Sequence, residues 1–149
     1  MIHCLKLKPI GLVILSLLVF VFLAVGCHRK PTRPADLPEL TPCTISVTFG
    51  GEVIEGVGII LIPEDTQINK WRAGGKTDNE GRATMITSSV FDGVVPGNYV
   101  VSFKKLDKPV GMQEPPSLIP KKYLPNQSKE TITVTKEQKE YVFELEGLK

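Results

Sequence analysis

Proline and glycine interrupt this chain so often that they limit which regular elements can form. The 149 residues include 12 prolines and 13 glycines, and most of these lie beyond residue 26. Proline removes a backbone donor and glycine favours turns, so neither residue suits the interior of a long helix. The sequence therefore predicts short strands joined by turns, and nothing in its pattern requires a helix.

Alternating side chains predict where the strands lie. Residues 44–49 place Ile45, Val47 and Phe49 on one face, and the glycine pair at 50–51 supplies a hairpin turn. Further strands are predicted at residues 57–62, 83–87, 99–103, 132–134 and 141–145. Residues 63–75 and 107–125 are predicted as loops, the second because it holds five prolines. About seven short strands of this kind predict an all-β fold, a single Ig-like or transthyretin-like β-sandwich over residues 43–149.

The segment 76–82 is predicted as a hairpin turn with Gly81 in the left-handed conformation. Its acidic residues superficially resemble a calcium-binding loop, but no glutamate follows at the distance that an EF-hand needs. We therefore predict no metal site and no cofactor.

A long apolar run near the N-terminus is predicted to target the protein to or across a membrane. Residues 10–26 are almost wholly apolar and follow a short segment that carries Lys6 and Lys8. This is typical of a secretory signal peptide, although the run also reaches the short end of the roughly 17–25 residues that a membrane anchor needs.

The end of this run favours the signal peptide. Leu23-Ala24-Val25-Gly26-Cys27 resembles the bacterial lipobox, in which a small residue stands directly before an obligatory cysteine. The resemblance implies that residues 1–26 are removed and that Cys27 carries lipid, which anchors the protein to a membrane. Alanine stands at position 24, where leucine is commonest in that family. Two or three acyl chains suffice for stable anchoring, whereas one is marginal.

The residues after Cys27 predict a tether over positions 27–42, because four prolines lie within it. The first of these residues is His28 and not aspartate. In lipoproteins of the Gram-negative enteric type, aspartate at that place retains the protein at the inner membrane. We therefore expect the bacterial cell envelope, with the outer membrane favoured over the inner one.

Charge and cysteine usage exclude some partners. Without residues 1–26 the chain has 16 basic and 16 acidic residues, so there is no electrostatic argument for nucleic acid. Once Cys4 is removed and Cys27 carries lipid, Cys43 has no partner within the chain. At the start of a strand it is predicted to be a small apolar packing residue, with pairing between two molecules as the alternative.

Three stretches resemble small bacterial lipoproteins with a carboxypeptidase-regulatory-like domain, which is a transthyretin-related, Ig-like sandwich. These stretches are the strand and proline at 56–63, the Thr-Asp-x-x-Gly turn at 77–83 and the Pro-Gly-x-Tyr strand start at 96–101. The resemblance covers about residues 43–147 and implies an accessory or stabilising module. Its motifs concern turns and core residues and carry no activity. The Gly50-Gly51 turn departs from the charged turn of that family, which leaves the register of the first hairpin open.

These features predict a non-catalytic module that binds or scaffolds a protein partner. Candidate contact residues are Trp71, Arg72 and Tyr123, although Trp71 also fits a residue that closes one end of the sandwich. An enzyme is not expected, because His28 is the only histidine beyond the signal and no nucleophile has a local base. The alternative is a carbohydrate-binding module of the cell envelope, but Trp71 is the only tryptophan available for an aromatic platform.

Overall fold

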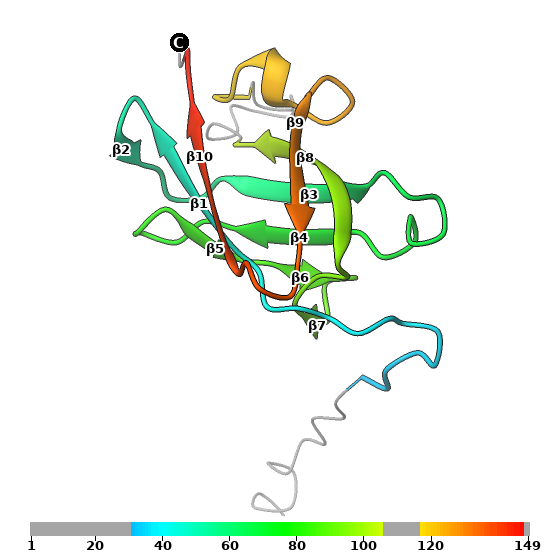
Figure 1. Cartoon of the computed structure of the whole chain (residues 1–149). Helices are drawn as coiled ribbons and strands as arrows, with labels where there is room; N and C mark the ends of the chain where they lie inside the picture. The colour runs from blue at the N-terminus through cyan, green and yellow to red at the C-terminus, as the bar shows by residue number, and fades with distance from the viewer. Residues whose placement is uncertain (1–30, 106–116, 148–149) are drawn as a thin grey trace, which may run out of the picture. The chain divides into compact units, whose positions relative to one another are not determined.

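Two β-sheets packed face to face make up the part of the chain that the computed structural model describes, residues 31–105 and 117–147 (Figure 1). The strands in chain order are β1 (Thr44–Phe49), β2 (Glu52–Val53), β3 (Gly58–Pro63), β4 (Ala73–Lys76), β5 (Arg82–Thr84), β6 (Ile86–Thr87), β7 (Phe91–Asp92), β8 (Gly97–Lys104), β9 (Glu130–Val134) and β10 (Glu140–Leu145). In these ranges the only helical element is the 3-10 turn η1 (Lys121–Tyr123). The predicted all-β sandwich is confirmed.

The smaller sheet is built around β1. The last strand, β10, lies parallel to β1 on one side, in register from Thr44 opposite Glu140 to Phe49 opposite Leu145. On the other side β1 pairs with β2 and, nearer its start, with β5. The larger sheet has the order β7-β6-β4-β3-β8-β9. The chain therefore begins and ends its fold in two neighbouring strands of one sheet.

Side chains that alternate along the strands and point inward fill the space between the two sheets. In β1, Ile45 and Val47 are fully buried, and in β8 Tyr99, Val101 and Phe103 are fully buried. The burial of each side chain of this size stabilises a fold by roughly 1.5–3 kcal/mol. These predicted core positions are confirmed, and so is the hairpin at residues 50–51, where Phe49 lies opposite Glu52.

A buried tyrosine fixes the start of β8. The hydroxyl of Tyr99 donates to the carbonyl oxygen of Val95 at 2.5 Å, four residues earlier in the chain. Burial raises the pKa of this phenol to about 12. The arrangement resembles the tyrosine corner of Greek-key sandwiches, in which a tyrosine hydroxyl bonds to the backbone a few residues upstream.

The glycine pair at 74–75 is part of β4, so the prediction that it belongs to a loop is wrong. Gly75 faces the other sheet, and a Cβ atom there would lie 2.8 Å from the Thr84 carbonyl oxygen and 2.9 Å from the Met85 sulfur. Glycine lets the two sheets approach closely at this point, which is a reason to find it inside a strand. Pro63, expected to end the strand before it, forms the last residue of β3.

The turn at residues 77–82 connects the two sheets. Asp78 Oδ1 accepts hydrogen bonds from the backbone amides of Glu80 and Arg82, each at 2.9 Å. Gly81 has the expected left-handed conformation, with φ of 72°. The predicted hairpin is wrong, however, because β4 pairs with β3 and β6, whereas β5 pairs with β1. The carboxylate of Asp78 thus orders the backbone of a crossover.

Candidate functional site

The predicted lipid-attachment residue, Cys27, lies outside the described residues, as do the predicted signal peptide and the first part of the tether. Within the part of the chain that the structure describes, no helix has the length and apolar character needed to cross a bilayer.

The predicted tether is folded over much of its length. Residues 33–41, here called the strap, belong to the same compact unit as the sandwich, which begins at Arg33. The strap runs along one end of the sandwich, drawn in blue to cyan in Figure 1. The prediction of an extended tether up to residue 42 is therefore wrong over this segment. No periodic pattern in this segment predicts that Leu37 is buried.

Apolar contacts hold the strap in place. Leu37 is 6% exposed and packs with Trp71 and Val95, which are 8% and 3% exposed. Three partly buried side chains complete this cluster, Leu40, Ile68 and Phe91. Thr41 adds a β-bridge, in which its amide donates to the Val94 carbonyl oxygen and its carbonyl accepts from the Val94 amide, both at 2.8 Å. The strap is thus anchored by a small second core and by backbone pairing.

Ion pairs add to the contacts at the surface. The ammonium of Lys70 pairs with Asp36, and it lies 5.0 Å from the centre of the Trp71 ring. The ammonium of Lys136 pairs with Glu39 at 2.6 Å. These hydrogen bonds lower the pKa of both carboxyl groups. Exposed pairs of this kind are screened by solvent and contribute little to stability, so the apolar contacts of Leu37 carry most of the attachment.

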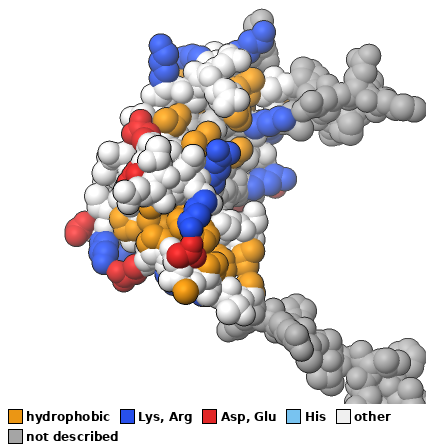
Figure 2. Space-filling model, turned by 90° about the vertical axis from the view of Figure 1, so that its right-hand side faces the viewer, with side chains coloured by type: hydrophobic (Ala, Val, Ile, Leu, Met, Phe, Trp, Pro, Cys, Tyr) orange, Lys and Arg blue, Asp and Glu red, His pale blue; other side chains and the backbone are white. Residues whose placement is uncertain are grey.

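Figure 2 shows the side of the sandwich that lies to the right in Figure 1, where the strap and the loop between β3 and β4 are found. Hydrophobic side chains gather in the lower part of this face, between basic and acidic ones.

Of the three residues predicted to contact a partner, two lie inside the protein. Trp71 belongs to the strap cluster, and Tyr123 is 5% exposed. The Tyr123 ring meets Phe103 edge to face at 6.2 Å, and its hydroxyl accepts a hydrogen bond from the Glu146 amide at 3.1 Å. Their burial leaves both aromatic rings little surface for a partner. Arg72 is exposed. Trp71 does close one end of the sandwich, which was the alternative that the sequence left open.

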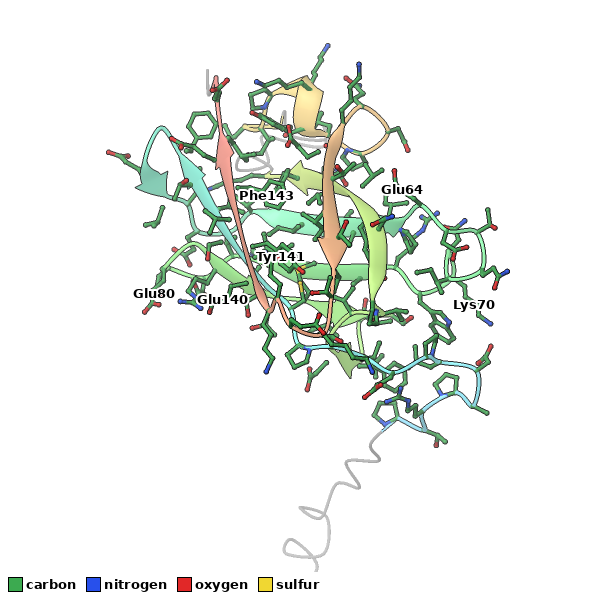
Figure 3. All side chains as sticks on the ribbon, viewed as in Figure 1. Glu64, Lys70, Glu80, Glu140, Tyr141 and Phe143 are labelled. Carbon is green, nitrogen blue, oxygen red and sulfur yellow. The ribbon has the colours of Figure 1, made fainter. Side chains whose placement is uncertain are left out.

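One side of β10 has no partner strand among the described residues, and we call this side the β10 edge. β1 occupies one side of this strand, and no described strand pairs with the other. Tyr141 and Phe143 point from β10 toward the larger sheet (Figure 3), where Phe143 meets Phe103 at 5.2 Å between ring centres. The Tyr141 hydroxyl donates to the Thr133 carbonyl oxygen of β9 at 3.0 Å. The backbone of β10 is therefore held firmly while its edge remains open.

The outward side chains of β10 give this edge its character. Glu140, Val142 and Glu144 alternate with the inward ones and are all exposed. Val142 is 72% exposed, more than any other large hydrophobic residue described. Glu140 pairs with Arg82 at 2.7 Å. The alternation was predicted from sequence, but the position of β10 at an edge was not, because pairing order leaves no local signal.

The one cysteine among the described residues is Cys43. Cys43 is 1% exposed in the main core, as predicted for a packing residue, and burial raises its pKa to about 11. Its thiol is therefore protonated at neutral pH, whereas the thiolate is the reactive form. No group of three or more metal-ligating side chains comes together in residues 31–105 and 117–147.

No family model, curated protein or solved structure matches this chain. The resemblance to lipoproteins with a carboxypeptidase-regulatory-like domain therefore stays a prediction from the sequence.

Proposed function

We propose that this protein is a lipid-anchored lipoprotein of the bacterial cell envelope whose sandwich binds an extended segment of a partner protein along the β10 edge. The observation that carries the proposal is the open side of β10, a six-residue strand with Val142 at 72% exposure. An unpaired strand edge presents a row of N–H and C=O groups that another chain can complete.

The side chains of β10 indicate which segment would fit. Glu140, Val142 and Glu144 lie on one face at alternate positions, so an added strand would place its own alternate side chains beside them. Opposite charges on neighbouring strands contribute roughly 0.2–1 kcal/mol per pair. The partner would therefore carry basic residues on both sides of an apolar one, with a small polar residue between each.

A peptide titration tests this binding mode. The probe is an extended peptide that alternates lysine, threonine, valine, threonine and lysine, added to the isotope-labelled Cys27→Ser protein. We expect amide shifts in nuclear magnetic resonance spectra concentrated at residues 140–145. Glu140→Lys with Glu144→Lys should weaken binding by about tenfold or more, given the charge pairs lost. The matched control, Val53→Lys, changes an exposed valine on the opposite side of the same sheet and should have no effect. Shifts spread evenly over the protein, or centred on β2, would contradict the proposal.

The anchor is tested separately. Cells grown with labelled palmitate should incorporate label into the wild-type protein and not into Cys27→Ser. Fractionation of the same cells then distinguishes the outer membrane, which we propose because His28 follows Cys27, from the inner one. Equal labelling of the two proteins would refute lipid attachment at this residue.

We do not propose glycan binding, because the Trp71 ring that an aromatic platform would need is 8% exposed and packs against the strap. We likewise propose no catalytic role, since the Cys43 thiol is buried in the core and its raised pKa keeps it protonated at neutral pH.

A further inference from the structure

We infer that the strap holds the sandwich close to the bilayer, with one defined end facing it. The inference rests on the proposed lipid at Cys27 and concerns what the chain does beyond it. A free tether from Cys27 to residue 42 would let the domain move and rotate widely. The packed strap instead makes residues 33–41 part of the same compact unit as the sandwich.

Covalent geometry sets the distances. An extended chain spans at most about 3.3–3.6 Å per residue, so the stretch from Cys27 to Arg33 reaches about 20 Å. If the strap were released as far as Cys43, the same limit would be about 55 Å. The docked strap thus cuts the maximum distance between lipid and folded domain by more than half.

The strap is folded on itself at its start and attached to the sandwich farther along. The guanidinium of Arg33 donates to the Pro38 carbonyl oxygen at 2.6 Å, a contact within the strap that fixes its start to its middle. Asp36 then pairs with Lys70 of the sandwich. In its middle, Leu37 fills the pocket beside Trp71. At its end, Thr41 forms the two backbone hydrogen bonds with Val94. The middle and the end of the strap are therefore fixed to the sandwich, and Arg33 is fixed to the middle, so the strap transmits the position of the anchor to the sandwich.

The topology then fixes which end faces the membrane. The strap leads directly into β1, and β10 runs parallel to β1, so both strands start near the strap and run away from it. The contact between Lys136 and Glu39 places the turn between β9 and β10 beside the strap as well. The β10 edge therefore extends from the membrane-facing end outward, with Glu144 farther from the bilayer than Glu140.

Energy transfer from the domain to the bilayer tests this arrangement. The lipidated protein is placed in vesicles that contain an acceptor-labelled lipid, with a donor dye on Glu137→Cys near the strap or on Gln127→Cys in the loop between η1 and β9. Labelling is selective because Cys43 is buried and Cys27 carries lipid. We expect clearly greater transfer from position 137 than from position 127.

Two changes separate the strap from other effects. Leu37→Asp introduces a charge at a buried strap position and should lower the transfer from both dyes and reduce their difference, whereas Ala35→Asp, at an exposed strap position, should not. Inserting about twenty Gly and Ser residues between Pro31 and Thr32 leaves every described contact intact. For a flexible chain, the insertion raises the root-mean-square distance between Cys27 and Arg33 from about 14 to about 28 Å. It should therefore also lower the energy transfer from both dyes to the bilayer. Equal transfer from the two dyes in the wild type, or equal behaviour of Leu37→Asp and Ala35→Asp, would overturn the inference.

A second measurement tests docking of the strap independently of lipid attachment at Cys27. Trp71 is the only tryptophan, so its emission reports strap docking without any lipid in Cys27→Ser protein produced without residues 1–26. Leu37→Asp should shift this emission to longer wavelength, while circular dichroism retains the sandwich signal, and Ala35→Asp should leave it unchanged. An emission that does not respond to Leu37→Asp would overturn strap docking even if Cys27 proves to be lipidated.

Discussion

Replacing Gly75 by alanine should destabilise the sandwich, whereas the same change at the neighbouring Gly74 should not. Both residues lie in β4, and neither has a positive φ, so the backbone conformation suits alanine at either position. They differ in what a Cβ atom would meet. At Gly75 it would lie 2.8 Å from the Thr84 carbonyl oxygen and 2.9 Å from the Met85 sulfur, whereas at Gly74 its nearest neighbour is the Ile59 carbonyl oxygen at 3.4 Å.

The magnitude follows from these contacts. The Thr84 oxygen belongs to the backbone of β5 and cannot rotate away, so the two sheets must separate locally. Overpacking of this kind costs about 1–3 kcal/mol. Replacing glycine by alanine also restricts the unfolded chain, which contributes about 0.4–1 kcal/mol of stability where alanine fits. We therefore expect a loss of about 2 kcal/mol for Gly75→Ala and no loss, or a gain of a few tenths of a kcal/mol, for Gly74→Ala.

Urea unfolding of the Cys27→Ser protein, followed by circular dichroism, measures both free energies. With a denaturant slope of about 1.5 kcal/mol/M, a loss of 2 kcal/mol lowers the midpoint by about 1.3 M. The thermal midpoint should fall by roughly 10 °C. If the two alanine variants unfold at the same urea concentration, the close approach of β4 and β5 at Gly75 is not a determinant of the fold.

Two further outcomes are expected from the buried core. Tyr99→Phe should lower the free energy of unfolding by about 1–2 kcal/mol in urea titrations, because it leaves the Val95 carbonyl oxygen without its 2.5 Å hydrogen bond; Tyr141→Phe, at a less buried hydroxyl, should cost less. Burial raises the pKa of Cys43 to about 11. The neutral thiol therefore stabilises the folded state below about pH 9. This contribution of about 3 kcal/mol to the free energy of unfolding should disappear as the pH rises toward 11. In Cys43→Ala the free energy of unfolding should begin to fall only near pH 10, where the raised pKa of Tyr99 takes effect. If this free energy still falls between about pH 9 and 10 in the variant, Cys43 is not the group responsible.

The elements that the sequence predicts well are those whose signal is local. Alternation over residues 44–49 and 99–103 identifies the buried faces of β1 and β8, because one face of each strand meets the other sheet. Asp78 and Gly81 identify a turn, because a carboxylate that bonds nearby amides and a residue that tolerates positive φ are local requirements.

The features that escaped the sequence depend on distant partners. The glycine pair at 74–75 has the local pattern of a loop, and only its contact with β5 explains why glycine lies inside a strand. The 77–82 turn has the local pattern of a hairpin, but the strands that it joins belong to different sheets. Leu37 lies among prolines, in a segment without periodicity, and only the folded positions of Trp71 and Val95 give it a pocket. The β10 edge is likewise defined by pairing between the first and last strands, which no local pattern encodes.

The pairing of β1 with β10 also has a consequence for the order in which the protein can fold. These strands lie at opposite ends of the folded chain, so their contacts have a large sequence separation, which is associated with slow folding. If the chain is exported N-terminus first, as a lipoprotein of the proposed kind would be, β1 reaches the envelope before β10 has crossed the membrane. Until then, one side of β1 stays unpaired and exposed to other chains. Completion of the smaller sheet therefore waits for the last residues of the chain, and truncation before Glu140 should leave a species prone to aggregate.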